Sequence, residues 1–228
     1  MSKTKLKAPN QPSVLIAVPC MSHVPVEFMS SFVTLDPTPR GAISMESGSL
    51  VDKARNKLAE NAIRGGFDYI MWIDSDMVFQ TDLVRKLLED ARHGKDYVTA
   101  IAFTRGLPIK PTIYDTVDWE PKEEGGVVTG AHTYWDYPRD QLFKIEASGL
   151  GACLMKTSLL VDVSKEFKCA PFNMLQGIGE DMSLCWRLKK MGVEMWCDSR
   201  IKVGHVGWVV FGESLYLGQQ EDKNGVGK

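Results

Sequence analysis

Two aspartates one residue apart, Asp74 and Asp76, directly follow the apolar run at residues 69–73. In an extended chain, residues i and i+2 project to the same side, so both carboxylates are expected to converge on one cation while Ser75 points away. Hard oxygen ligands suit Mg²⁺ or Mn²⁺, and such an ion commonly completes its coordination with substrate phosphates. Two plainer interpretations stay open: the acids cap a helix that begins near Thr81, or they form a solvated turn.

Two further acids, Glu180 and Asp181, follow a glycine-rich segment at residues 177–179 and begin a helical pattern. Acids in the first turn of a helix stabilise it by about 0.3–1 kcal/mol each, which is a purely structural role. The glycines also permit close approach of a ligand, and a carboxylate beside a substrate hydroxyl can take its proton. The pattern therefore predicts either a helix start or a catalytic pair.

His205 and Arg55 are two more candidates for chemistry. His205 lies at the end of an apolar pattern between Gly204 and Gly207. A lone histidine is more often structural, but this position suits a third metal ligand, and a nitrogen ligand favours Mn²⁺. Arg55 belongs to a helix expected beside the strand that precedes Asp74, where it either lies on a solvated face or clamps a diphosphate.

Apolar strands and amphipathic helices alternate in the first half of the chain, where we expect strands at 13–19, 42–46, 69–73 and 97–103 and helices at 49–64 and 83–91. This order predicts an α/β fold with a mainly parallel central sheet and helices on both faces. Ligands of such sheets bind beyond the carboxyl ends of the strands, where Asp74 and Asp76 lie.

The second half is less regular and predicts a smaller mixed sheet. A polar, Pro-rich stretch at 21–40 and an exposed insertion at 115–137 carry no periodicity. Expected elements are strands at 142–146, 152–155, 193–197 and 200–206, and helices at 157–166 and 180–191. We expect a disordered basic leader at 1–12, one domain at 13–217 and a polar tail at 218–228.

Composition excludes some partners. Lys and Arg number 27 against 29 Asp and Glu, for a formal net charge of -2, so no global basic field favours nucleic acid. No window holds the roughly 20 apolar residues that a membrane span needs, and the leader lacks the apolar stretch of a signal peptide. A cytoplasmic setting, in a bacterium or a virus-infected host cell, is expected; the oligomeric state is not indicated.

Six segments, in this order, resemble the GT-A-fold glycosyltransferases, most closely the family-two-like bacterial and viral members with a DxD motif. They are Val18-Pro19, Ala54-Arg55-Asn56, Trp72-Ile73-Asp74-Ser75-Asp76, 148–155, Gly179-Glu180-Asp181 with 185–188, and 204–207. The resemblance covers roughly residues 13–210, and the order of the motifs is more specific than any one of them.

The resemblance implies a single GT-A domain, Rossmann-like, that transfers one sugar from a nucleoside diphosphate sugar to a hydroxyl acceptor of unspecified class, with Mn²⁺ or Mg²⁺ as cofactor. The implied metal ligands are Asp74, Asp76 and His205. The implied nucleotide-sugar contacts are Pro19, Arg55, Asp74, Ser75, Gly149 and Gly151. Asp181, with Glu180 beside it, matches the base of inverting members, whereas a histidine ligand also occurs in retaining ones, so the stereochemical outcome stays open.

Other functions are compatible with parts of the pattern. The chain lacks the Q-x-x-R-W motif and membrane helices of processive synthases, which favours transfer of a single sugar. Asp74-Ser75-Asp76-Met77-Val78 also fits the nucleophile motif of haloacid-dehalogenase-like phosphohydrolases, although that motif normally follows the first strand. A non-catalytic module that binds a nucleotide sugar or carbohydrate is a further alternative. A nucleotidyltransferase is disfavoured because no glycine-rich phosphate loop follows the first strand.

Overall fold

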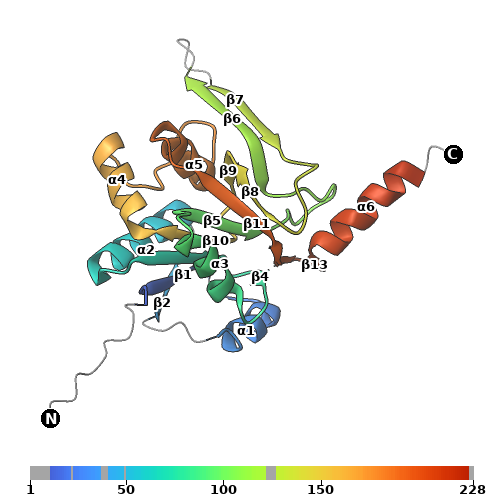
Figure 1. Ribbon diagram of the computed structural model, residues 1–228, viewed down its shortest axis with the longest axis horizontal. Coiled ribbons are helices and arrows are strands. Elements are labelled where there is room, and N and C mark those ends of the chain that lie inside the picture. Colours follow the sequence, from blue (N-terminus) through green and yellow to red (C-terminus); the bar gives the residue numbers. More distant parts are fainter. Residues whose placement is uncertain (1–10, 22, 37–40, 49, 122–126, 226–228) are drawn as a thin grey trace.

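A seven-stranded sheet forms the centre of the computed structural model, which describes residues 11–21, 23–36, 41–48, 50–121 and 127–225 (Figure 1). In spatial order the strands are β2 (Gly41–Ser47), β1 (Val14–Cys20), β3 (Tyr69–Ile73), β10 (Ala152–Lys156), β5 (Tyr97–Ile101), β11 (Met195–Lys202) and β8 (Leu142–Ile145).

The sheet is mixed, which corrects the expectation of a mainly parallel one. β1 runs parallel to β2 and β3, and β5 runs parallel to β11. β10, however, lies antiparallel between β3 and β5, and β8 is antiparallel to β11. The helix-strand alternation before residue 101 indicates the parallel pairing of β1 with β2 and β3. β10 enters the sheet only after the long segment 102–151, so no short crossover fixes its direction.

Helices cover both faces of the sheet, as expected. Alternate side chains of β1 point to opposite faces: Leu15 and Ala17 pack in one core, and Val14, Ile16 and Val18 in the other. The first core is covered by α2 (Val51–Gly65), α4 (Thr157–Phe167) and α5 (Glu180–Lys190), and the second by α1 (Val26–Val33) and α3 (Leu83–Arg92). Burial on both faces explains the unbroken apolar runs of the central strands.

Two three-stranded sheets flank the centre. One consists of β13 (Val210–Phe211), β12 (Gly204–Val206) and β4 (Met77–Val78), and the other of β7 (Val127–Thr133), β6 (Ile113–Pro121) and β9 (Ala147–Ser148). The expected insertion at 115–137 contains most of the β6–β7 hairpin, which projects from the body at the top of Figure 1. The strand pieces expected at 193–197 and 200–206 are instead β11, which continues through a bulge to Lys202, and then β12.

Two helical segments lay outside the sequence prediction. α1 falls within the Pro-rich stretch, and Phe28 is its one buried residue, so the segment shows no periodicity. The tail expected from residue 218 is, as far as Gly225, the second half of α6 (Glu213–Gly225). Residues 1–10 of the expected leader and 226–228 lie outside the described residues. None of the described helices combines the length and apolar character needed to cross a bilayer.

Candidate functional site

The acidic segment after β3 is a tight turn, not an extended strand end. The backbone N–H of Met77 donates to the carbonyl of Asp74 at 3.1 Å, which closes the turn. Asp74 N–H donates to Gly151 O at 3.0 Å, and Val206 N–H donates to Asp76 O at 2.7 Å, so β10 and β12 hold the turn from two sides. The turn gives the two carboxylates different partners within the protein, and their convergence on one cation stays a prediction.

Asp74 is held by a buried arginine. Arg55, on α2, is 3% exposed, and its Nη2 lies 2.8 Å from Asp74 Oδ1 while its Nε lies 3.1 Å from Glu180 Oε1. Burial raises the pKa of Asp74 above its usual value, and the charge of Arg55 opposes that rise. Arg55 Nη1 is buried with no hydrogen-bond partner among the described residues. The guanidinium therefore ties the acidic turn to the start of α5, and does not form an open clamp.

Asp76 faces two cationic or potentially cationic side chains. Its Oδ2 lies 2.9 Å from Arg105 Nη1 and 3.2 Å from His205 Nε2. Burial alone would raise the pKa of Asp76, but the hydrogen bond and charge of His205 and the charge of Arg105 bring it below its usual value. The two carboxylates of the turn therefore differ in the direction of their pKa shift, which is downward for Asp76 and upward for Asp74.

A hydrogen bond at Nδ1 fixes the tautomer of His205. His205 Nδ1 lies 3.0 Å from Phe103 O, and because a carbonyl only accepts, Nδ1 carries the proton. Either a second proton on Nε2 or a cation must then separate Nε2 from Asp76 Oδ2. This is the arrangement in which a histidine serves as a metal ligand, with its other nitrogen on a backbone carbonyl.

The donor set for a metal is thus smaller than the sequence predicted. In the part of the chain that the structure describes, no group of three or more His, Cys, Asp and Glu side chains is arranged to hold a metal ion. Asp76 and His205 fit a cation between them, whereas Asp74 is engaged by Arg55. The two remaining ligands leave most of a six-coordinate Mn²⁺ or Mg²⁺ shell to substrate and water.

Asp181 lies in the first turn of α5, and none of the described Lys, Arg or His side chains forms an ion pair with it. Its Oδ1 accepts from Met182 N–H at 2.7 Å. Burial, followed by the charge of Glu180, raises the pKa of Asp181 to about 6, although Arg55 acts in the opposite direction. Asp181 therefore has a pKa near neutrality, the range in which a carboxylate works best as a general base.

Gly149 and Gly151 border the two halves of the site. A Cβ at Gly149 would lie 3.6 Å from Asp181 Oδ2 and 3.5 Å from Thr112 Cβ, so the absent side chain leaves space against the Asp181 carboxylate. A Cβ at Gly151 would meet Met77 Cε at 3.2 Å. Gly149 therefore lies directly against the Asp181 carboxylate, and Gly151 allows β10 to approach the acidic turn.

A hollow of about 250 Å³ lies beside the carboxyl end of β1. Pro19 is buried there and is paired in register with Glu46 of β2. The hollow is lined by Glu46, Ser47, Gly48, Leu50, Lys53 and Ala54. Ser75 is half-buried in the acidic turn. The hollow and the turn share the carboxyl edge of the parallel strands β1, β2 and β3, as the sequence predicted for ligand-binding groups.

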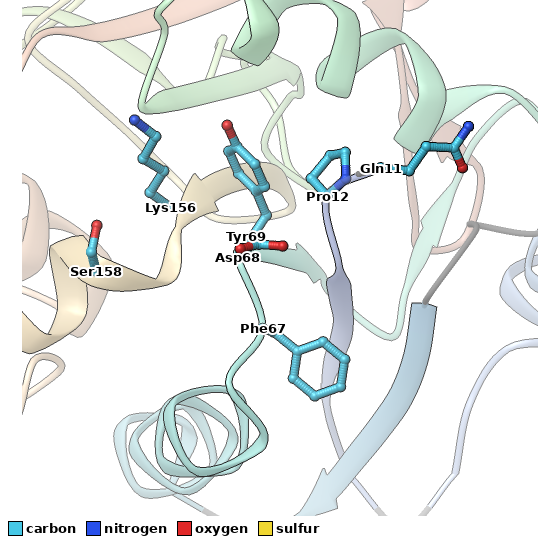
Figure 2. A pocket seen from close by; sticks show the side chains of 7 residues that line it. All are labelled: Gln11, Pro12, Phe67, Asp68, Tyr69, Lys156 and Ser158. Carbon is cyan, nitrogen blue, oxygen red and sulfur yellow. The ribbon is translucent and has the colours of Figure 1, made fainter. Parts of the chain in front are cut away.

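A hollow of about 480 Å³ lies at the opposite edge of the sheet (Figure 2). Its lining residues lie before β1, at the start of β3 or just before it, and at the end of the antiparallel β10 or just after it: Gln11, Pro12, Phe67, Asp68, Tyr69, Lys156 and Ser158. Lys156 Nζ is paired there with Asp96 at 2.7 Å. None of the predicted site residues lines this hollow, so size alone does not locate the site.

Sequence reasoning missed Arg105. The residue follows β5 by four positions and reaches Asp76 from the loop beyond that strand. Its signal was the same one that pointed to the acids, namely a charged residue just past the carboxyl end of a buried strand. The prediction applied that rule to β3 alone.

Comparisons with known proteins bear on the fold. No protein-family model and no curated protein sequence matches the chain. Among solved structures, 341 chains match, so the architecture is a recurrent one. One of them is A197 from STIV, whose crystal structure superposes with a TM-score of 0.59 at 17% identity over 86% of each chain. At that identity the likeness shows a shared mixed α/β fold, that of a large sheet flanked by helices.

Proposed function

We propose that this chain is a glycosyltransferase that moves a single sugar from a nucleoside diphosphate sugar to a hydroxyl acceptor. The observation that carries the proposal is that two acids with different environments lie at the carboxyl ends of the parallel strands. Asp76 faces His205 and Arg105, which suits a cation and a diphosphate, and Asp181, with a pKa of about 6, lies against Gly149. The motif order that resembles GT-A enzymes supports the same assignment.

Asp76 and His205 are the residues that would hold Mn²⁺ or Mg²⁺. When bound, the ion supplies Lewis-acid stabilisation of the charge that develops on the leaving diphosphate. Arg105 Nη1, 2.9 Å from Asp76 Oδ2, is the nearest additional cation for that charge. The hollow next to Pro19 and Glu46, on the β2 side of the turn, would receive the nucleoside.

Asp181 is the better base of the two acids in α5. Glu180 is paired with Arg55 Nε at 3.1 Å, whereas Asp181 Oδ2 lies 3.6 Å from the position that a Cβ at Gly149 would take. In the proposed reaction Asp181 takes the acceptor hydroxyl proton, the acceptor oxygen bonds to the anomeric carbon, and the bond from that carbon to the diphosphate oxygen breaks. A single displacement of this kind inverts the anomeric carbon.

The arrangement around Asp74 argues against the phosphohydrolase alternative. That chemistry needs the first aspartate of the motif as a free nucleophile, whereas Asp74 Oδ1 accepts from Arg55 at 2.8 Å. Asp74, Arg55 and Glu180 are proposed as positioning residues that fix the acidic turn against α5.

A thermal-shift screen tests this proposal. The full chain is heated with a panel of nucleoside diphosphates and nucleoside diphosphate sugars, each with Mn²⁺ and with chelator. A ligand at 100 times its Kd raises the free energy of unfolding by about 2.7 kcal/mol, so one class of nucleotide is expected to raise the melting temperature with Mn²⁺ present. A panel that produces no shift under either condition contradicts the proposal.

A further inference from the structure

The hairpin formed by β12 and β13 carries an exposed tryptophan beside the acidic turn. Trp208 is 81% exposed, and its neighbours Val209 and Val210 are 49% and 42% exposed. The Trp208 ring contacts the buried Phe211 ring, with centroids 6.5 Å apart. A large indole left in water at a hairpin tip contributes little to packing, so folding alone does not account for it.

Strand register places this tip at the acidic turn. β12 is antiparallel to β4, with Gly204 opposite Val78 and His205 opposite Met77. The next residue, Val206, donates its N–H to Asp76 O at 2.7 Å. Since the two segments run in opposite directions, the residues after Val206 continue past Asp76 on the side of Asp74 and Ser75.

The hairpin that presents Trp208 is tightly packed at its base. A Cβ at Gly204 would lie 2.4 Å from Val210 Cγ1 and 2.7 Å from Val78 Cγ2, and one at Gly207 would lie 3.0 Å from Phe211 Cε2. The N–H of Gly207 also donates to Val209 O at 2.9 Å across the tip. Trp208 therefore projects from a constrained turn, which limits the conformational entropy lost when a ligand binds.

Trp208 and the nucleoside hollow lie on opposite sides of the acidic turn. The hollow is formed by β2 and the start of α2, on one side of β3 in the sheet order. His205 Nδ1 bonds Phe103 O, just beyond β5, which lies on the other side of β3. A ligand on Trp208 would therefore lie across the acidic turn from the hollow proposed for the nucleoside, the side on which an acceptor is expected.

We propose that Trp208 is a stacking platform for a saccharide acceptor, so that the hydroxyl acceptor of this enzyme is a carbohydrate. This inference rests on the proposed function. A pyranose ring has a face of C–H groups and a rim of hydroxyls; the flat indole with two adjacent valines covers the apolar face and leaves the hydroxyls free. One hydroxyl can then be directed toward the acidic edge of the sheet.

The test uses the full chain with Mn²⁺ and an array of immobilised neutral oligosaccharides built from hexoses and N-acetylhexosamines. Oligosaccharides that bind are then titrated by calorimetry into wild type, Trp208→Ala, Trp208→Phe and the matched control Trp196→Ala. Trp196 is the second residue of β11, near the end of that strand away from the acidic turn, and Lys95 Nζ lies 3.8 Å from the centroid of its ring. We expect Trp208→Ala to weaken saccharide binding about tenfold or more, with Trp208→Phe and Trp196→Ala within about threefold of wild type.

Nucleoside diphosphate binding on the same preparations separates the two proposals. If nucleotide binding is intact and wild type and Trp208→Ala bind saccharide with equal affinity, the Trp208 platform is overturned and the proposed transferase function is not. Failure of wild type to bind any oligosaccharide on the array also overturns it, as does a change of oligomeric mass in Trp208→Ala without loss of saccharide binding. Saccharide binding that depends on Trp208 without any nucleotide binding supports the platform and overturns the transferase.

Discussion

At the scale of single residues, the four acids of the site differ in environment more than in type. Asp74 and Glu180 both form ion pairs with Arg55. Asp76 contacts His205 and Arg105. Asp181 accepts a hydrogen bond from one backbone N–H, that of Met182. As a result, the pKa of Asp76 is lowered, and the pKa of Asp181 is raised to about 6. Acids whose pKa values are pushed apart in this way are suited to different steps of one reaction.

The charge of Glu180 is one cause of the raised pKa of Asp181, second to burial. In Glu180→Gln that charge is absent, so the pKa of Asp181 is expected to fall by about one unit. A ¹³C NMR titration of labelled aspartate carboxyl carbons measures this directly, with Asp181→Asn identifying the resonance. A pKa that stays the same or rises in Glu180→Gln would show that burial alone sets it.

The residue types of the site and the closeness of His205 and Arg55 to the acidic segment were predictable, but which aspartate each would contact was not. Asp76 and His205 adjoin because β12 pairs with β4, a contact between segments more than 120 positions apart in the chain. The different partners of Asp74 and Asp76 follow from a turn that the hydrogen bond from Met77 N–H to Asp74 O closes. A D-x-D spacing is compatible with either a strand or a turn, so spacing alone could not decide between convergence and divergence.

At the scale of elements, the interface between α3 and β11 contains a second cluster of charged side chains. Asp90 on α3 and Asp198 on β11 are both buried, and Arg200 bonds both of them, at 3.1 Å and 2.8 Å. Burial, and the adjacent Asp198, raise the pKa of Asp90 to about 6. Burial would also raise the pKa of Asp198, but its hydrogen bonds from Arg200 bring it below the usual value.

The raised pKa of Asp90 makes the stability of this join depend on pH. A carboxyl with a raised folded-state pKa contributes stability that is fully present below about pH 4 and is lost as the pH rises through about 6. Asp90→Asn imitates the protonated form at every pH. We therefore expect it to raise the free energy of unfolding by about 2 kcal/mol at pH 7.5 and to change it little at pH 4, as measured by urea unfolding.

Asp198→Asn is the matched variant, and its effect on the free energy of unfolding at pH 7.5 is expected to have the opposite sign. The lowered pKa of Asp198 contributes stability that is present above about pH 4 and lost as the pH falls through the lowered value. Asp198→Asn is therefore expected to lower the free energy of unfolding at pH 7.5. If both variants lowered the free energy of unfolding equally at that pH, the prediction would be wrong, and Asp90 and Asp198 would each stabilise the fold as ion-pair partners of Arg200.

Element positions followed closely from the sequence where periodicity was strong. β1, β2, β3 and α2 begin and end within two residues of their expected bounds, because each has a buried face or a glycine stop. α1 was missed because Phe28 alone is buried, and β6 and β7 because their segment is rich in glycine, acids and aromatics. The direction of β10 was missed because strand patterns carry no sign of parallel or antiparallel pairing.

At the scale of the whole molecule, the site is assembled from segments spread over most of the chain. Helix α2 supplies Arg55, the turn after β3 supplies the acids, the loop after β5 supplies Arg105, α5 supplies Asp181 and β12 supplies His205. The mixed sheet brings them to one edge because β1, β3 and β5 end there and β10 begins there. The hollow of about 480 Å³ at the other edge gathers none of them.

Calorimetric titration of the nucleoside diphosphate sugar that gives the largest thermal shift tests the central claim most directly. Wild type, Asp76→Asn and the control Asp162→Asn, an exposed residue of α4, are titrated with Mn²⁺ and with chelator. We predict Mn²⁺-dependent binding in wild type and Asp162→Asn that weakens at least about tenfold in Asp76→Asn. Binding that chelator and Asp76→Asn both leave unchanged would contradict the account.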